Sequence, residues 1–132
     1  MFNPFVSIIV RAKNEDFWIG KCLNEIFNQQ YQNFEVILVD NNSKDKTISI
    51  VRKNFPKVKI INYKSKTFFP GKALNLGIKK SKGQLIAMIS GHCIPKNNKW
   101  LNKLAQNFKN SEVIACYGRQ EPSDISEPND VR

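Results

Sequence analysis

Short apolar runs alternate with amphipathic segments along the chain, and this alternation limits the fold more than any other feature of the sequence. The runs are rich in Ile, Val and Leu, which is typical of strands buried on both faces. The segments between them repeat apolar residues at helical spacing. We therefore predict strands at residues 6–10, 34–39, 58–63, 85–89 and 113–117. Helices are predicted near residues 18–27, 46–54, 74–82 and 100–108, with Gly83 as the C′ residue of the third.

Strands that alternate with helices are joined by βαβ crossovers. We predict an α/β fold, a three-layer α/β/α sandwich around a mostly parallel, Rossmann-like sheet. One domain is expected at residues 1–120, followed by a loose, proline-containing tail at residues 121–132. Ligands of such sheets bind beyond the carboxyl ends of the strands. Polar segments at residues 11–15, 40–43 and 90–92 each follow a predicted strand, so a ligand site is expected there.

The chain of 132 residues carries 21 Lys and Arg against 11 Asp and Glu, a formal net charge of +10. The lysines are scattered and do not alternate with aromatic residues, so a nucleic-acid partner is not expected. Three widely spaced cysteines indicate reduced thiols. No apolar stretch approaches the roughly 20 residues of a membrane span, and the N-terminus does not resemble a signal peptide. The expected location is the cytoplasm, with the inner face of the membrane as a peripheral alternative.

Several familiar site types do not match this sequence. The turn after the first predicted strand, RAKNE, has no glycine and so lacks the dinucleotide-binding pattern. Gly71-Lys72 lacks the other residues of a P-loop. Cys93 follows His92, but neighbours on an extended chain point to opposite sides, which disfavours a Cys–His nucleophile. We expect Cys93 to be a small core residue.

Two blocks of the chain carry a family resemblance. Residues 6–51, which include VDNNSKDKT, and residues 68–95, FFPGKALNLGIKKSKGQLIAMISGHCIP, resemble consecutive blocks of family 2 glycosyltransferases with the GT-A fold. Together they cover most of the chain in the right order, and VDNNSKDKT is a specific match. The resemblance implies that this half of the fold binds the nucleotide of a nucleotide-diphosphate sugar, with a UDP-type donor favoured.

The resemblance assigns Asp40 to the nucleobase, because its carboxylate can accept a hydrogen bond from the N3–H group of uracil. Asn42, in the same segment, is a second expected contact of the nucleotide sugar. An alternative role for Asp40 is an Asx turn that caps the helix at residues 46–54. Ser43 or Asp45 could also cap that helix.

Arg11, Asn14 and Glu15 follow the first predicted strand and would line the same crevice. The family more often has a Pro-Thr-Tyr-Asn-Glu turn here, so Arg11 and Lys13 depart from the common pattern within a known variation. The alternative for Asn14 is a helix N-cap, a role that is also open to Asp16.

Lys72 and Asn75 are the expected contacts from the third helix. Lys72 lies near the start of that helix, whose N–H groups would themselves attract a diphosphate. Asn75 matches an Asn of the family in this block. The alternative for Lys72 is a solvated surface lysine.

Ser90, Gly91 and His92 stand where the GT-A fold normally carries an Asp-x-Asp motif, which contacts the ribose and holds a divalent cation on the diphosphate. Ser90 would then replace the ribose carboxylate, and His92 the metal ligand. An imidazole is an acceptable ligand for Mn²⁺ and a poorer one for Mg²⁺. A Mn²⁺ or Mg²⁺ ion at His92, direct contact of protonated His92 with the phosphates, and a structural role all stay open.

The family's acceptor-binding half, with its catalytic base, normally follows the fifth strand. Here only a short tail follows, and none of its carboxylates can be assigned as base. We expect a truncated product, a fragment of a split enzyme or a binding domain, and little transfer by the chain alone. Other classes stay open: a non-catalytic module that binds another polypeptide or itself, and nucleic-acid binding driven by net charge.

Overall fold

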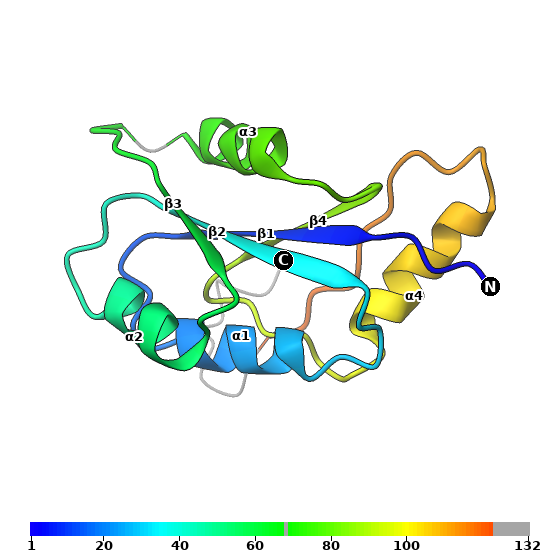
Figure 1. Ribbon diagram of the computed structural model, residues 1–132, viewed down its shortest axis with the longest axis horizontal. Coiled ribbons are helices and arrows are strands. Elements are labelled where there is room, and N and C mark those ends of the chain that lie inside the picture. Colours follow the sequence, from blue (N-terminus) through cyan, green and yellow to red (C-terminus); the bar gives the residue numbers. More distant parts are fainter. Residues whose placement is uncertain (68, 123–132) are drawn as a thin grey trace.

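The computed structural model describes residues 1–67 and 69–122 (Figure 1). Four of the five predicted strands are present in this part of the chain, and they alternate with four helices. In chain order the elements are β1 (Val6–Ala12), α1 (Ile19–Phe27), β2 (Phe34–Asp40), α2 (Thr47–Asn54), β3 (Lys59–Asn62), α3 (Pro70–Lys80), β4 (Leu85–Ser90) and α4 (Trp100–Gln106), followed by a 3₁₀ turn at Asn107–Lys109.

The four strands form one parallel sheet in the order β3-β2-β1-β4. Both central strands are almost entirely buried, which explains why their sequences are apolar without alternation. Because all strands run the same way, their carboxyl ends meet at one edge of the sheet. The predicted α/β class and parallel sheet are confirmed.

Helices cover both faces of the sheet, so the predicted three layers are confirmed (Figure 1). Ile8 and Val10 of β1 pack with α1, α2 and α4 in the larger core. Ile9 points to the opposite face, where it packs with Val39 of β2 and Ala73 of α3. Each fully buried aliphatic side chain of this kind stabilises the fold by about 1.5–3 kcal/mol.

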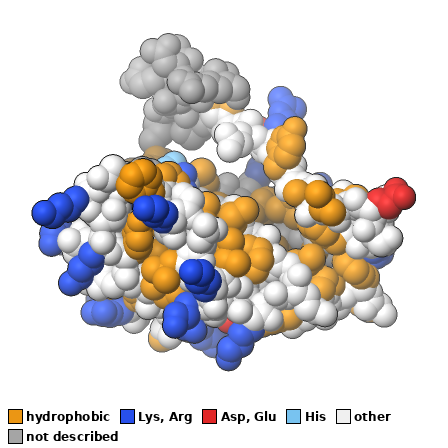
Figure 2. Space-filling model, turned by 90° about the horizontal axis from the view of Figure 1, so that it is seen from above, with side chains coloured by type: hydrophobic (Ala, Val, Ile, Leu, Met, Phe, Trp, Pro, Cys, Tyr) orange, Lys and Arg blue, Asp and Glu red, His pale blue; other side chains and the backbone are white. Residues whose placement is uncertain are grey.

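The β4 strand is less covered than its neighbours on the side where α3 lies. Ile86 and Met88 of β4 are 36% and 57% exposed. They pair in register with Ser7 and Ile9, both of which are fully buried. Figure 2, viewed from the α3 side, shows hydrophobic side chains gathered in a band on this face and basic side chains at several separate points.

One predicted strand is wrong. Residues 113–117 form no strand, and Ile114 and Tyr117 are 93% and 95% exposed. An apolar run becomes a strand only if its backbone finds a hydrogen-bonding neighbour. None of the described residues forms a sheet with this run.

The predicted helix ends also need correction. The third helix ends at Lys80 with Ser81 as its C-cap, so Gly83 is not its C′ residue. Instead, Gly83 lets two backbones approach, because a Cβ there would lie 2.4 Å from the Ser7 nitrogen. Neither Asn14 nor Asp16 caps α1, whose N-cap is Trp18. The division at residue 120 stays a prediction, since residues 123–132 lie outside the described part.

None of the helices in the described part of the chain is both long and apolar enough to cross a membrane. Cys22, Cys93 and Cys116 are free thiols, as expected. The prediction that Cys93 is a core residue is wrong, because it is exposed. It follows His92 in the loop after β4, beyond the last buried position of the strand.

Candidate functional site

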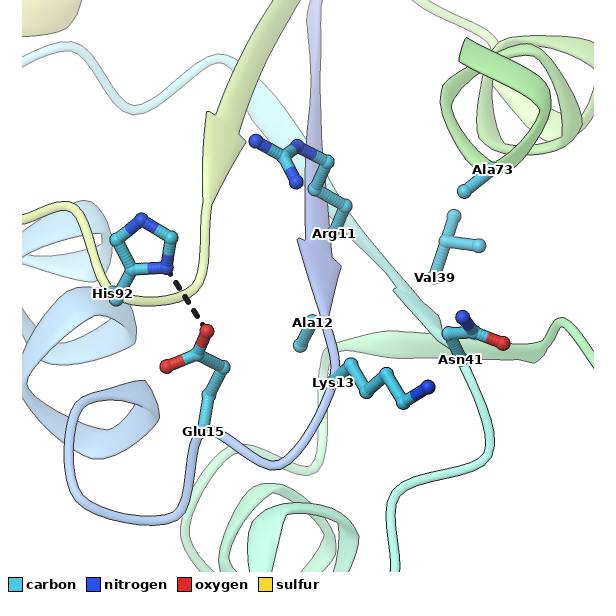
Figure 3. Close-up of a pocket in the computed structure, with 8 residues that line it drawn as sticks. All are labelled: Arg11, Ala12, Lys13, Glu15, Val39, Asn41, Ala73 and His92. Carbon is cyan, nitrogen blue, oxygen red and sulfur yellow. Dashed lines mark hydrogen bonds and ion pairs between the residues drawn. The ribbon is translucent and has the colours of Figure 1, made fainter. Parts of the chain in front are cut away.

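A pocket of about 290 Å³ opens at the carboxyl ends of the central strands (Figure 3). Its walls come from the ends of β1, β2 and β4 and from the first turn of α3. This is the edge at which parallel sheets bind ligands. The lining residues are Arg11, Ala12, Lys13, Glu15, Val39, Asn41, Ala73 and His92.

The pocket has two chemically different sides (Figure 3). Val39 and Ala73 form an apolar wall on one side, next to Asn41. Glu15 and His92 form a charged wall on the other side. Arg11 and Lys13 extend from the end of β1 in opposite directions, Arg11 on the His92 side and Lys13 on the Asn41 side of this view. An elongated ligand with an uncharged end and an anionic end would match this polarity.

Asp40 and Ser43 connect the loop after β2 to the loop after β1. The Ser43 N–H donates to Asp40 Oδ2 (2.9 Å), and the Ser43 hydroxyl donates to Asp40 Oδ1 (2.5 Å). The same hydroxyl accepts the N–H of Asn14 (2.8 Å). Asn14 Oδ1 in turn accepts the N–H of Lys44 (2.8 Å). Asn14 adopts a positive φ of 51°, which Asn tolerates better than most residues.

Asp45 and Thr47 repeat this arrangement one step further along both loops. The Thr47 hydroxyl donates to Asp45 Oδ1 (2.5 Å) and accepts the N–H of Glu15 (2.8 Å). Asp45 Oδ2 accepts the N–H of Asp16 (3.0 Å). Desolvation alone would raise the pKa of Asp45, but the hydrogen bonds from Thr47 and Asp16 outweigh it and lower the pKa. Two acid–hydroxyl pairs thus fix the backbone that carries Glu15.

Glu15 reaches across the pocket entrance to the histidine after β4. Its Oε1 lies 2.9 Å from His92 Nδ1. The His92 side chain is 51% exposed and that of Glu15 is 19% exposed. This contact links the ends of β1 and β4, and it directs the imidazole along the charged wall (Figure 3).

Close packing around the residue before His92 explains why it is a glycine, Gly91. The Gly91 N–H donates to the Arg11 carbonyl (2.9 Å), which extends the pairing of β4 with β1 by one step. A Cβ at Gly91 would lie 3.2 Å from Ile19 Cδ1 and 3.3 Å from Ala12 Cβ. Gly91 therefore lets the chain turn tightly against α1 and place His92 at the pocket.

Ser90 ends β4 inside the protein. The Cys22 thiol donates to its carbonyl (3.8 Å). Burial, with smaller contributions from Cys93 and Glu15, raises the pKa of Cys22 to about 12. Cys22 is therefore a neutral packing residue beneath the site and not a nucleophile.

Residues 7–130 match the family model described as glycosyl transferase family 2. The chain belongs to glycosyltransferase family 2. A glycosyltransferase of Haloferax volcanii, AglE, is 36% identical over 122 residues, which cover 89% of this chain and 40% of that protein. An uncharacterised glycosyltransferase of Haemophilus influenzae is 33% identical over 138 residues, which cover 100% of this chain and 53% of that protein.

Solved structures of glycosyltransferases share the fold. The mannosyltransferase PcManGT from Pyrobaculum calidifontis, in complex with GDP-Man and Mn²⁺, has a TM-score of 0.71 and 25% identity. The match covers 83% of this chain and 32% of PcManGT. S. aureus TarS in complex with UDP-GlcNAc has a TM-score of 0.69 and 25% identity, over 90% of this chain and 37% of that chain. This family 2 chain thus spans about half or less of the length of these relatives.

The ten residues expected at the site of this glycosyltransferase chain fall into three groups. Arg11, Glu15 and His92 line the pocket. Four others support it from behind or beside, namely Asn14, Asp40, Ser90 and Gly91. Asn42, Lys72 and Asn75 are exposed outside the lining. Lys72 Nζ lies 4.6 Å from the centre of the Phe69 ring.

Asp40 is only 1% exposed, and both of its carboxylate oxygens accept hydrogen bonds from Ser43. This is the Asx-type turn that was the alternative for Asp40, although it does not cap α2, whose N-cap is Lys46. Direct contact between Asp40 and a nucleobase stays a prediction.

The sequence reasoning missed Asn41, and a signal for it was present. Successive residues of a strand point to opposite faces. Val39 faces α3. With this alternation, Asp40 points to the opposite face of the sheet, and Asn41 points to the α3 side again, where the pocket lies. Lys13, Val39 and Ala73 are also lining residues that were not predicted as site residues.

No three His, Cys, Asp or Glu side chains among residues 1–67 and 69–122 form a group that could hold a metal ion. The one imidazole–carboxylate pair at the site is His92 with Glu15. Cations that bind nucleotides take one or two protein ligands together with phosphate oxygens. The pair therefore fits a cation whose other ligands come from a diphosphate, and a Mn²⁺ or Mg²⁺ ion at His92 stays a prediction.

Proposed function

We propose that this pocket binds a nucleotide-diphosphate sugar, with a UDP-type donor favoured, for transfer of the sugar to an acceptor hydroxyl with inversion. The polarity of the pocket carries this proposal. The apolar wall at Val39 and Ala73 suits a flat, uncharged base. On the other side, the cationic Arg11 and the exposed His92 suit the diphosphate. The complexes of PcManGT with GDP-Man and of TarS with UDP-GlcNAc support it by similarity.

In this reaction the acceptor oxygen bonds to the anomeric carbon while the bond from that carbon to the diphosphate breaks. The acceptor proton goes to a base, and negative charge collects on the leaving diphosphate. Arg11 and Lys13 supply positive charge at the pocket. The Nδ1–H group of His92 donates to Glu15. This leaves Nε2 to donate to the diphosphate when the imidazole is protonated, or to bind a cation when it is neutral. A divalent cation bound by His92 and Glu15 would further neutralise the leaving group.

We also propose that the isolated chain transfers little sugar. Glu15 is the one carboxylate in the described lining, and its Oε1 is held by His92. A base must lie within hydrogen-bond reach of the acceptor hydroxyl. A site without that base and without a held acceptor loses orders of magnitude in rate, at about 1.4 kcal/mol of barrier for each factor of ten.

Calorimetric titration tests the binding proposal. UDP, GDP and dTDP, each with and without an attached sugar, are titrated into the 132-residue chain in EDTA and then in Mn²⁺. We expect measurable binding of at least one nucleotide diphosphate and tighter binding of UDP than of dTDP-type ligands. Absence of binding for all of them at millimolar concentration would contradict the proposal. Rapid acceptor-dependent sugar transfer by the same chain would contradict the proposal that the isolated chain transfers little sugar.

A second candidate function is docking on another polypeptide or self-association without catalysis. The observation in its favour is the exposed α3-side face of β4, with Ile86 and Met88. Light scattering tests self-association. If the chain self-associates, its measured mass exceeds that of the monomer, and the Met88→Lys substitution lowers the measured mass. A monomeric mass at all concentrations would contradict self-association, and docking on a different polypeptide would be the only remaining form of this second function.

A further inference from the structure

A second cavity, of about 430 Å³, lies between the N-terminal residues, the loop after α1 and the α4 region. Figure 1 shows the N-terminus beside α4, at the end of the sheet where β1 begins. The first pocket lies at the other end, where β1 stops. Since β1 has seven residues, at about 3.3 Å for each residue roughly 23 Å separate the two. The second cavity is therefore remote from the candidate nucleotide-sugar site.

Side-chain amides dominate the lining of this cavity. They come from three separate parts of the chain, and they are Asn3, Gln30, Gln32, Asn102 and Gln106. Each amide presents an acceptor oxygen beside a donor NH₂ group. Lys109 is the one charged side chain among the described lining residues, and none of these residues is acidic. The cavity is thus polar but almost uncharged.

Much of the hydrogen-bonding capacity of these amides is not used within the described part of the protein. Asn3 and Gln30 form hydrogen bonds there only through their backbone atoms. Gln32 Nε2 donates to a backbone carbonyl, and none of the described residues donates to its Oε1. Gln106 Nε2 donates to Asn102 Oδ1 (3.1 Å), which leaves Asn102 Nδ2 and Gln106 Oε1 for other partners. Both donors and acceptors therefore remain for a ligand.

Two aromatic rings add an apolar part to the same lining. Tyr31 is 7% exposed, and its hydroxyl donates to the Pro4 carbonyl, so its ring is fixed and its polar atom is already paired. Phe2 is half-buried and lines the same cavity. Aromatic rings offer a large apolar surface, which suits the C–H faces of a sugar ring.

We propose that this cavity binds an uncharged saccharide. Most ring carbons of a saccharide carry a hydroxyl, and each hydroxyl both donates and accepts, as the amides of the lining do. An anionic ligand would be held by Lys109 alone among the lining side chains, and an apolar ligand would leave the amides unpaired. The two sites share no described lining residue, so the inference does not depend on the proposed nucleotide-sugar binding. A saccharide bound here lies far from the sugar that is transferred.

NMR titration of the 132-residue chain tests the proposal, with maltotriose, cellotriose and triacetylchitotriose as uncharged probes. We expect at least one probe to shift the backbone resonances of residues 30–32 and 102–109 at millimolar concentration. The resonances of residues 12–15 and 92 should stay in place. Absence of shifts for all three probes at tens of millimolar would overturn the inference. Shifts centred on residues 12–15 and 92 would place the saccharide in the first pocket and would overturn it as well.

Asn102→Leu tests whether the amides make the contact, because leucine has nearly the same shape and no hydrogen-bonding group. We expect the affinity for the best saccharide probe to fall at least about tenfold. The matched control is Asn24→Leu, at an exposed position of α1 outside the lining, and it should leave that affinity unchanged. Equal affinities of the wild type and Asn102→Leu would overturn the inference. If Asn102→Leu does not fold, Gln30→Leu, in the exposed loop after α1, replaces it with the same expectation.

Two further probes test the class of ligand on the wild type. Inorganic phosphate would report an anion site at Lys109, and capped trialanine would report a site for peptide groups. We expect both to bind at least about tenfold more weakly than the best saccharide, because neither carries a row of hydroxyls. If either probe shifts residues 30–32 and 102–109 with an affinity equal to that of the saccharide, the cavity does not select hydroxyl groups and the inference is overturned.

Discussion

Ile9 and Met88 lie opposite each other on neighbouring strands and point to the same face of the sheet, yet their surroundings differ completely. Ile9 of β1 is fully buried under α3, whereas Met88 of β4 is 57% exposed. The helix covers β1 and β2 and leaves the corresponding face of β4 open. The fold is therefore held mainly by its two central strands.

The candidate site is divided in the same way. The loops after β1 and β2 are joined by two acid–hydroxyl pairs, each of which holds a backbone N–H of the other loop. The loop after β4 presents His92, whose side chain contacts Glu15 and is half exposed. In the proposed function, the base would meet the rigid part of the site and the diphosphate the adjustable part.

The largest expected difference is between Ile9→Ala and Met88→Ala. Ile9→Ala leaves a cavity in a closed core and should lower the free energy of unfolding by about 2–5 kcal/mol. Met88→Ala removes a largely exposed side chain and should change it by less than about 0.5 kcal/mol. Urea denaturation of both variants measures the difference. If Met88→Ala is as costly as Ile9→Ala, the open face of β4 is covered in solution, for example by a second copy of the chain.

Removing one hydroxyl from the joined loops should have the next largest effect. Thr47→Val keeps the shape of a fully buried side chain but leaves the Glu15 N–H and Asp45 without the hydroxyl. The expected loss is about 1–3 kcal/mol in the free energy of unfolding. Hydrogen exchange should also become faster at the Glu15 amide.

Ser49→Ala is the matched control, because this exposed hydroxyl of α2 bonds only to the Lys46 carbonyl of its own helix turn. Its effect should be a few tenths of a kcal/mol at most. Equal effects of Thr47→Val and Ser49→Ala would mean that the two loops are not held together as described.

His92→Ala should change ligand affinity rather than stability. If His92 meets the diphosphate or its cation, the variant binds UDP at least about tenfold more weakly, a change of about 1.4 kcal/mol. Uridine affinity should be unchanged, since the base lies on the other side of the pocket. Calorimetry on both ligands measures this, with Cys93→Ala, an exposed neighbour, as control. A parallel loss for uridine would place His92 against the base and reverse the proposed orientation.

The sequence predicted the buried central strands more accurately than it predicted the exposed run at residues 113–117. In β1 and β2, burial on both faces leaves a continuous apolar run, and the predicted strands agree with the structure to within two residues. Residues 113–117 are also an apolar run but form no strand, because pairing depends on a neighbouring strand that local composition cannot reveal. The N-cap of α1 was missed because the Asn14 side chain bonds to the loop after β2 instead of capping the helix. Asp45 bonds both across the two loops and locally, since its Oδ1 accepts the N–H of Thr47 at the start of α2 (2.9 Å).

The site residues were predictable as a segment but not one by one. Arg11, Glu15 and His92, which follow two of the predicted strands, do line one pocket, and their contact with a ligand stays a prediction. Asp40 was assigned to the nucleobase by resemblance and by its ability to accept a hydrogen bond, and this contact stays a prediction. The strand period directs Asp40 and Asn41 to opposite faces, and only Asn41 lines the pocket. The contact between Glu15 and His92 joins residues 77 positions apart, and no local pattern predicts it.

The smallest effect concerns acid, and Asp45 is the residue that should produce it. Hydrogen bonds from Thr47 and Asp16 lower its pKa below the ordinary value of 3.8. A carboxylate with a lowered pKa stabilises the fold fully above its unfolded value, and this contribution is lost as pH falls through the lower folded value. Wild type should therefore exceed Asp45→Asn in stability at neutral pH, and the difference should shrink as the pH falls below the ordinary Asp value of 3.8 and through the lower folded value. Measuring unfolding of both proteins across this range isolates Asp45 from the other carboxylates. Because the partners are a hydroxyl and backbone N–H groups, not cations, the difference should persist in about 1 M salt. A difference that is constant with pH would show that Asp45 does not hold the two loops as an anion.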